Sequence, residues 1–196
     1  AVDEVDVIYT DEDKIDQAGR HHELPFFKPD WSPERLRCQM YLGHLLVIRR
    51  TLMERVGGFR PGYDGSLDYD LALRVTEQAR RIHHIPKVLY HCRSAPRSAA
   101  DRIDTKPTAD DAARAALADH AKRVGLEADV VDVEPGVYRL QRHFRERPAP
   151  LVSLVVPTRG TSSTVWGQRR CFVTALAQSL VDQTTYERWE FVCVAD

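Results

Sequence analysis

The stretch Val5-Asp6-Val7-Ile8-Tyr9-Thr10-Asp11-Glu12-Asp13 decides the expected fold of this chain. Residues 5–9 are mostly β-branched or aromatic, which predicts one buried strand. Three acids follow it, and in an extended chain the side chains of Asp11 and Asp13 point to the same side. Two carboxylates at the carboxyl end of a buried strand suit a hard divalent cation, and ligands of open α/β sheets bind at that edge. The competing interpretation is a solvated acidic turn.

The composition is that of an ordinary globular protein. The chain has 196 residues, a formal net charge of −1 and 43% hydrophobic residues, which is enough for one domain or two small ones. Because there is no strong basic excess, nucleic acid is not expected as a partner. No apolar run approaches the roughly 20 residues that span a bilayer. The four cysteines are scattered without a Cys-x-x-Cys pair, which argues against a zinc knuckle or a disulfide framework.

The first residues contain neither an initiator methionine nor a signal-peptide pattern. We therefore expect the chain to be cut from a larger protein. Together with the scattered cysteines, this indicates a cytoplasmic location, with peripheral attachment to the inner face of the cell membrane as an alternative.

Loops and short elements alternate between residues 14 and 60. Prolines and aromatic residues at 14–34 predict an ordered but irregular loop that contains Trp31. Ser32 and Pro33 suit the start of a helix that would run to about residue 40. A short strand is expected at 45–48, followed by a helix at 52–56 that ends at two glycines.

A loop at residues 62–70 leads into a helix expected at 71–80, where apolar residues recur at helical spacing. Asp68 and Asp70 stand at its amino end, where the peptide dipoles favour a negative charge. A strand is expected at 85–90, and His91 terminates it. His91 thus follows the strand at 85–90 in the same way that Asp11 follows the strand at 5–9.

The remaining chain predicts a connector and a new α/β unit. Residues 94–108 are rich in Ser, Ala, Arg and Asp, as is typical of a mobile surface segment. An Ala-rich helix at 109–124 and a hairpin around Pro135-Gly136 precede a proline-punctuated linker at 142–150. The elements expected beyond the linker are a strand at 151–156, a helix at 169–181 and a strand at 189–194.

Three segments resemble the motifs of one enzyme family. Asp11-Glu12-Asp13 is similar to an Asp-x-Asp motif, Leu67-Asp68-Tyr69-Asp70-Leu71 to a Glu-Asp-x-Asp-Leu segment, and Tyr90-His91-Cys92-Arg93 to a strand end that supplies a metal ligand. These motifs belong to the inverting family 2 glycosyltransferases, which have the GT-A fold. The resemblance covers residues 1–97 and 151–196 and is closest to tandem-domain enzymes of bacterial surface-polysaccharide assembly. Leu67 departs from it, since the family usually has Glu there.

The resemblance implies an α/β class and a GT-A (Rossmann-like) nucleotide-diphospho-sugar transferase fold, incomplete, with a mixed, mostly parallel sheet. Residues 1–97 would be the metal and acceptor side of a first domain, residues 98–150 a helix, hairpin and linker, and residues 151–196 the opening strand–helix–strand of a second domain. The first domain would lack its opening half, which should hold the nucleobase and ribose. We therefore expect the fragment alone to be inactive.

The resemblance also implies roles for particular residues. Asp68 would be the catalytic base that takes the proton of the acceptor hydroxyl. A Mg²⁺ or Mn²⁺ ion would neutralise the leaving diphosphate. The implied metal ligands are Asp11, Asp13 and His91, the substrate-binding residues are Trp31, Gly65 and Asp70, and the nucleotide-binding residues of the second domain are Thr158, Arg159 and Asp196.

Each role has a simpler alternative. Asp68 could be a helix N-cap, and His91 could be a surface histidine at a strand end. Trp31 could anchor its loop by packing rather than stack on a sugar. Thr158 and Arg159 would otherwise be ordinary turn residues. His83 and His84 are interpreted as structural, because adjacent residues of a strand face opposite ways.

The expected function is transfer of a hexose, with inversion, from a nucleotide-diphosphate sugar to a glycan or lipid-linked glycan in O-antigen or capsule assembly. The remainder of its own polypeptide is a further expected partner. The alternative is a non-catalytic glycan-binding or scaffolding module, which Leu67 in place of Glu would favour. A metal-dependent phosphatase or nucleotidyltransferase would leave the segments around Asp68 and His91 without a role.

A half-sheet without its opening strands would leave apolar edges exposed. We therefore expect residues 151–156 and 191–194 to join the sheet of residues 5–9. This would happen within one chain or between the chains of a domain-swapped dimer.

Overall fold

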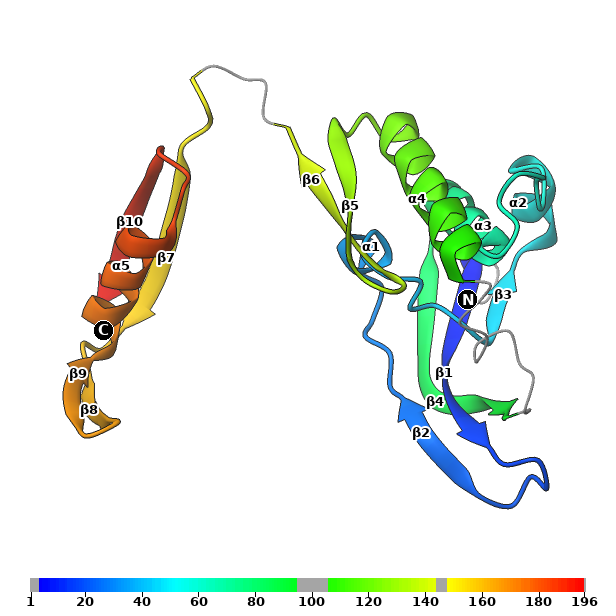
Figure 1. The fold of residues 1–196 in the computed structure, drawn as a ribbon, viewed down its shortest axis with the longest axis horizontal. Helices are drawn as coiled ribbons and strands as arrows, with labels where there is room; N and C mark the ends of the chain where they lie inside the picture. The colour runs from blue at the N-terminus through cyan, green and yellow to red at the C-terminus, as the bar shows by residue number, and fades with distance from the viewer. Residues whose placement is uncertain (1–3, 95–105, 144–147, 196) are drawn as a thin grey trace. The chain divides into compact units, whose positions relative to one another are not determined.

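The structure, a computed structural model, describes residues 4–94, 106–143 and 148–195 (Figure 1). The chain divides into two compact units, Ala1–His143 and Phe144–Asp196. Within the described residues, no helix is both long enough and apolar enough to cross a membrane.

Strand β1 (Val7–Ile15) is the centre of the first unit. Strand β4 (Ile82–Arg93) pairs with it in parallel along its whole length and so occupies one edge. The other edge is shared by two antiparallel strands: β3 (Leu46–Ile48) lies beside the first half of β1 and β2 (His22–Phe26) beside the second half.

Because pairing continues on both edges, β1 runs through its acids instead of ending before them. Asp11 is 3% exposed and Asp13 is 8% exposed, so the interpretation as a solvated acidic turn is wrong. The pairing with β4 is irregular at Asp11, where Thr10 pairs with Ile85 and Asp11 with Val88. This irregularity falls at Pro86, which has no N–H to donate to a ladder.

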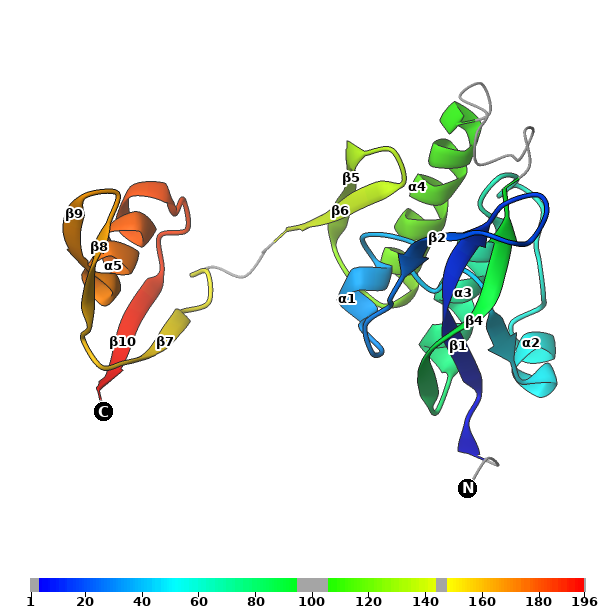
Figure 2. The ribbon, with the colours of Figure 1, turned by 90° about the horizontal axis from the view of Figure 1, so that it is seen from below.

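Helix α3 (Leu67–Gln78) covers one face of the sheet, as Figures 1 and 2 show. Its buried side chains include Leu73, which shares a core with Tyr9, and Val75, which shares a second core with Val7. Helix α2 (Arg50–Arg55) closes the second core with Leu52. The alternation of buried residues in β1 and the helical spacing in α3 thus meet, as the apolar pattern predicted.

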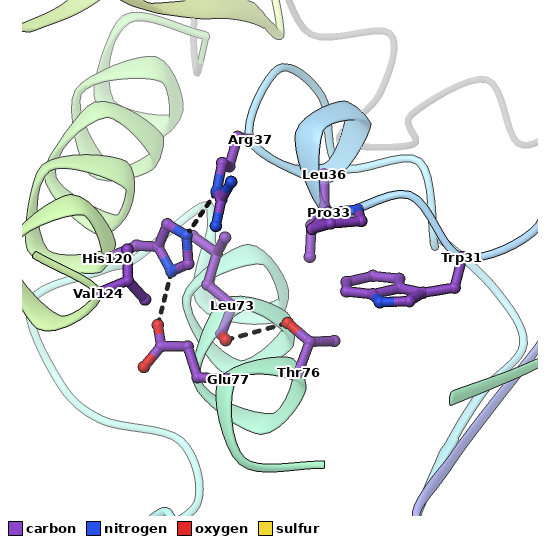
Figure 3. Close-up of a pocket in the computed structure, with 9 residues that line it drawn as sticks. All are labelled: Trp31, Pro33, Leu36, Arg37, Leu73, Thr76, Glu77, His120 and Val124. Carbon is purple, nitrogen blue, oxygen red and sulfur yellow. Dashed lines mark hydrogen bonds and ion pairs between the residues drawn. The ribbon is translucent and has the colours of Figure 1, made fainter. Parts of the chain in front are cut away.

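Helix α1 (Pro33–Leu36) is a single turn, shorter than the expected helix to about residue 40. The Ser32 hydroxyl accepts a hydrogen bond from the Arg35 amide at 3.3 Å, and proline occupies the first turn, as expected. Leu36 is 2% exposed and faces Leu73 across a small pocket (Figure 3).

Helix α4 (Lys106–Arg123) and the hairpin of β5 (Ala128–Glu134) and β6 (Val137–Arg142) confirm the expected helix and hairpin. Both belong to the first unit, because Ala113, Leu117 and Tyr138 lie in the same core as Tyr9. The approach of α4 is close enough that a Cβ on Gly65 would stand 3.0 Å from Ala109, and Gly65 has a φ of +91°.

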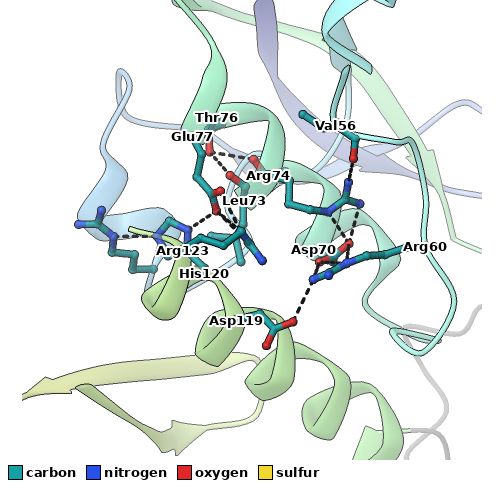
Figure 4. Close-up of polar contacts among 12 residues, drawn as sticks. Val56, Arg60, Asp70, Leu73, Arg74, Thr76, Glu77, Asp119, His120 and Arg123 are labelled. Carbon is teal, nitrogen blue, oxygen red and sulfur yellow. Dashed lines mark hydrogen bonds and ion pairs between the residues drawn. The ribbon is translucent and has the colours of Figure 1, made fainter. Parts of the chain in front are cut away.

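Two groups of charged residues join α3 to α4 (Figure 4). Asp70 is fully buried and accepts hydrogen bonds from Arg60 and Arg74, each at a shortest distance of 2.6 Å. Arg60 reaches on to Asp119 of α4 at 3.2 Å. In the second group, Glu77 of α3 binds His120 and Arg123 of α4 at 2.7 and 2.8 Å.

The second unit contains a strand–helix–strand arrangement. Strands β7 (Val152–Thr158) and β10 (Trp189–Ala195) pair in parallel, and α5 (Phe172–Gln183) lies between them in sequence. Strands β8 (Ser162–Val165) and β9 (Gln168–Cys171) form a hairpin that was not predicted, and β9 occupies the place where a helix from residue 169 was expected. Its turn residues Trp166 and Gly167 both have positive φ, as in a type I′ turn.

The expected GT-A (Rossmann-like) fold with a mostly parallel sheet is wrong for the described residues. The protein has a mixed α/β structure with small sheets, in which four of the six strand pairings are antiparallel: β1 with β2, β1 with β3, β5 with β6 and β8 with β9. Connections as short as residues 16–21, between β1 and β2, force an antiparallel return, because a parallel one needs a crossover of about a dozen residues or more.

The expectation that the tail would join the first sheet within the chain is also wrong. In the described residues, β7 and β10 form a two-stranded sheet of their own, while the sheet of β1 consists of β1, β2, β3 and β4. Exchange between two chains stays a prediction.

The buried Asp70 generates a test of stability. Asp70→Ala should lower the free energy of unfolding by about 3–5 kcal/mol, since it leaves the buried Arg74 without its counter-charge. Burial acts to raise the pKa of Asp70, but hydrogen bonds from Arg60 and Arg74 outweigh it and hold the pKa below its usual value. The stabilisation is therefore present above about pH 4 and is lost as the pH falls below it.

Urea denaturation at neutral and acidic pH measures both effects. The matched control is Asp64→Ala, which removes an exposed carboxylate six residues earlier and should change stability by less than about 0.5 kcal/mol. Equal losses in the two variants would contradict the structural role of Asp70.

Candidate metal centre

Three neighbouring strands bring one ligand-type side chain each to a common point. Asp13 of β1 is the register partner of His91 in β4, and His22 begins β2 on the other edge of β1. The Asp13 carboxylate accepts a hydrogen bond from His91 Nδ1 at 2.5 Å and from His22 Nδ1 at 2.8 Å. One ligand atom from each residue lies within 4.8 Å of the other two.

The centre opens to solvent through its histidines. The side chains of His22 and His91 are 54% and 42% exposed, whereas that of Asp13 is 9% exposed. The two imidazoles meet edge to face, with ring centroids 4.7 Å apart. Burial acts to raise the pKa of Asp13, but hydrogen bonds from His91 and His22 prevail and hold the pKa below its usual value. The carboxylate is thus an anion at neutral pH.

One carboxylate and two imidazoles form a donor set that fits a divalent cation. Imidazole nitrogen suits transition-metal ions, and carboxylate oxygen suits Mg²⁺ and Mn²⁺ as well. A cation held by Asp13, His22 and His91 would take the place of the protons that now join nitrogen to oxygen. Three protein ligands leave coordination positions for a substrate.

Asp11 is not in this group. Its Oδ1 accepts hydrogen bonds from the Lys28 amide at 2.9 Å and from His84 Nε2 at 2.8 Å. The other ring nitrogen of His84 contacts Asp30 at 3.2 Å, and the ring stacks on Tyr9 with centroids 4.7 Å apart. Asp11 and His84 therefore fasten the segment of residues 28–30 to the sheet, which agrees with the structural interpretation of His84.

The residues at the start of α3 are differently placed. Asp68 is exposed, and its Oδ1 accepts a hydrogen bond from the Tyr69 amide at 2.9 Å. Asp70 has no exposed surface that a substrate could contact, and both of its oxygens bind arginines. Gly65 permits the close approach of α4. None of the described polar contacts joins Asp68 to the Asp13 group, so its role as a base stays a prediction.

The other candidate residues lie elsewhere in the described structure. Trp31 is half-buried and lines the pocket between α1, α3 and α4. In the second unit, the Thr158 hydroxyl accepts a hydrogen bond from the Gly160 amide at 3.0 Å, as a turn residue would, and Arg159 is exposed. Asp196 lies outside the described residues. The nucleotide contacts of these three residues stay predictions.

His22 and Lys28 were not predicted from the sequence. His22 lies in the stretch expected to be irregular, and the pairing of β2 with β1 is what places it. Lys28 is 5% exposed, and its ammonium donates hydrogen bonds to Glu12 at 3.2 Å and to the carbonyls of Leu42 and His44, both at 2.7 Å. Burial lowers the pKa of Lys28, although Glu12 opposes this effect.

Sequence comparisons relate the chain to part of a bacterial O-antigen biosynthesis protein. No protein-family model matches it. The chain is similar to the O-antigen biosynthesis protein RfbC of Myxococcus xanthus, with 39% identity over 193 residues that make up 98% of this chain and 14% of that protein. It is also similar to the uncharacterized protein y4gI of Sinorhizobium fredii, with 37% identity over 190 residues, or 96% of this chain and 20% of that protein. The chain thus spans no more than a fifth of the length of these curated relatives.

The different surroundings of the two aspartates of β1 generate a prediction. Asp11→Ala should lower the free energy of unfolding by about 1–3 kcal/mol, because the Lys28 amide and His84 would lose a buried acceptor. Asp13→Ala should cost less, since its partners His22 and His91 are open to water. Urea denaturation without metal compares the two. A larger loss for Asp13→Ala would contradict this division of roles.

Proposed function

We propose that this chain carries the cation-binding and acceptor side of a metal-dependent glycosyltransferase in bacterial surface-polysaccharide assembly. The enzyme would transfer a hexose, with inversion, from a nucleotide-diphosphate sugar to a glycan or lipid-linked glycan. The observation that carries this proposal is the convergence of Asp13, His22 and His91 from three adjacent strands. The similarity to part of an O-antigen biosynthesis protein supports the biological setting.

The proposed chemistry assigns two tasks to the residues of this chain. Asp13, His22 and His91 bind the cation, which when present would neutralise charge on the leaving diphosphate. Asp68, an exposed carboxylate at the start of α3, accepts the proton of the attacking hydroxyl. Orientation of the acceptor is as necessary as the base, because misplacement by about 1 Å can cost a factor of 10² in rate.

A second candidate function is a non-catalytic glycan-binding or scaffolding module. Two observations favour it: Leu67 replaces the Glu of the motif that Asp68 belongs to, and Asp11 is engaged in a buried network rather than in the metal group. This alternative keeps recognition of a glycan but has no base and no donor nucleotide. Turnover of a nucleotide sugar separates the two functions.

Cation binding can be measured on this chain alone. Mn²⁺ titration followed by electron paramagnetic resonance should show one site, with a lower Kd than that of Mg²⁺ in competition, because two of the three ligands are imidazoles. His22→Ala and His91→Ala should each raise the Kd for Mn²⁺ at least about tenfold. His21→Ala, which removes the adjacent exposed histidine, is the matched control and should have no effect. If His22→Ala and His91→Ala bind Mn²⁺ as tightly as the His21→Ala control does, the proposed metal centre is wrong.

Transfer is tested in the protein at its full natural length. A screen of nucleotide sugars with Mn²⁺ should identify a donor, and Asp68→Asn should then lower kcat by about 10²–10⁴-fold with nucleotide binding retained. The amide keeps the shape of the side chain but cannot accept the proton. Asp64→Asn, in the loop before α3, serves as the control. Normal turnover in Asp68→Asn would assign the base to another residue.

A further inference from the structure

A pocket of about 230 Å³ lies between α1, α3 and α4, outside the candidate metal centre (Figure 3). Its volume is below the range of about 300–1,000 Å³ that is usual for drug-sized ligands, so it fits a ligand of roughly one ring. The pocket shares no residue with the Asp13 group. The residues that line it are Trp31, Pro33, Leu36, Arg37, Leu73, Thr76, Glu77, His120 and Val124.

One side of the pocket is apolar and the other is polar. The Trp31 indole lies beside Pro33 on one side, and His120 and Glu77 lie on the opposite side (Figure 3). Leu36, beside Pro33, and Leu73, toward His120, are 2% and 1% exposed and extend the apolar lining (Figure 3). A ligand in this pocket therefore needs one apolar surface and one edge that can form hydrogen bonds.

The polar wall is held in one arrangement. Arg37 Nε, which can only donate, lies 3.1 Å from His120 Nε2, so Nε2 is the acceptor. The proton of the neutral ring is therefore on Nδ1, which donates to Glu77 at 2.7 Å. Because these side chains already hold one another, little reorganisation is needed when a ligand binds.

The charges of Arg37 and Glu77, which both line the pocket, are opposite, and each side chain has a further partner. Arg37 pairs at 2.6 Å with Glu34, which also binds Arg142 at 3.1 Å. Glu77 pairs with Arg123 at 2.8 Å. An anionic ligand such as a phosphate or a uronic acid thus gains no net attraction here. Polar acceptors remain, because the Thr76 hydroxyl donates to the Ala72 carbonyl at 2.8 Å and keeps lone pairs on its oxygen.

We propose that this pocket binds one neutral pyranose ring of a glycan, with the C–H face of the sugar on the Trp31 indole and its hydroxyls toward the wall of Arg37, His120 and Glu77. A pyranose combines an apolar face with a hydroxyl-bearing edge, as the two sides of the pocket require. A nucleobase carries its hydrogen-bonding groups in the plane of its ring, so with one face on the Trp31 indole it would turn its other apolar face toward the polar wall. This inference rests on the proposed function, because it takes the bound glycan to be the acceptor of the transfer reaction. Binding of the sugar itself requires neither the cation nor the nucleotide-sugar donor.

The loop that presents Trp31 is fastened to the sheet. Asp30, the residue before Trp31, contacts His84 at 3.2 Å, and Tyr9 donates its hydroxyl proton to the Pro29 carbonyl at 2.6 Å. The Ser32 amide donates to the Tyr41 hydroxyl at 3.0 Å on the other side. Trp31 is therefore presented by a segment with hydrogen bonds on both sides.

The test measures binding of methyl hexopyranosides to the whole 196-residue chain in EDTA, by saturation-transfer NMR. At least one neutral hexoside should bind with a Kd on the order of 1 mM, since a single ring offers few contacts. Trp31→Ala should raise the Kd at least tenfold. Val124→Trp should do the same by filling the pocket while the indole of Trp31 stays in place. Trp166→Ala, which removes a tryptophan that is 91% exposed in the second unit, should leave the Kd unchanged.

Thermal unfolding of each variant verifies that it is folded. Absence of saturable binding by every neutral hexoside would overturn the inference, as would equal binding by the wild type and by Val124→Trp. Tighter binding of uridine monophosphate than of any hexoside, lost in Val124→Trp, would also overturn it and assign the pocket to a nucleotide. Mn²⁺ binding at Asp13, measured without sugar, reports separately on the proposed function. Sugar binding without Mn²⁺ binding would support the assignment of this pocket to a sugar and contradict the proposed metal centre.

Discussion

The parallel pairing of β1 with β4 is the constraint on which the rest of the first unit depends. It places His84 beside Tyr9 and His91 beside Asp13, so that two histidines of one strand meet two aspartates of the other. The irregular pairing near Pro86 shifts the register between these two contacts. Without that shift in register, the histidines of β4 would lie opposite other residues of β1 than Asp11 and Asp13.

The same strand makes one aspartate structural and leaves the next available. Asp11 is enclosed by the segment of residues 28–30, and its hydrogen bonds to the Lys28 amide and His84 are made in a medium of low dielectric, where an acceptor is costly to remove. Asp13 meets histidines that reach solvent. The ion that we propose at Asp13 would replace protons shared with solvent-exposed histidines, whereas an ion at Asp11 would displace the buried hydrogen bonds from the Lys28 amide and His84.

The sequence predicted the local elements better than their assembly. The first strand, the helix expected at 71–80 and the helix and hairpin that follow it could be predicted, because periodicity is a local signal. Their bounds could not, since β1 continues through the acids to Ile15 and α3 already begins at Leu67. Asp11, Asp13 and His91 were expected to form one group, and the structure brings together Asp13 and His91 but not Asp11. His22 could not be predicted, since its place depends on the register of β2, which pairs across a bulge. The antiparallel sheets were missed because the resemblance, rather than the connection lengths, determined the expected fold.

Helix α3 relates the pocket to the rest of the unit. Its first turn carries the exposed Asp68 and the buried Asp70, and its last turn carries Glu77 in the pocket wall. Asp70 binds Arg60, which reaches Asp119 of α4, and Glu77 binds Arg123 and His120 of the same helix. Two ion-pair groups, seven residues apart on one helix, therefore keep α4 from rotating against α3. Since His120 comes from α4 and Leu73 from α3, this restraint is what gives the pocket a definite shape before any ligand enters it.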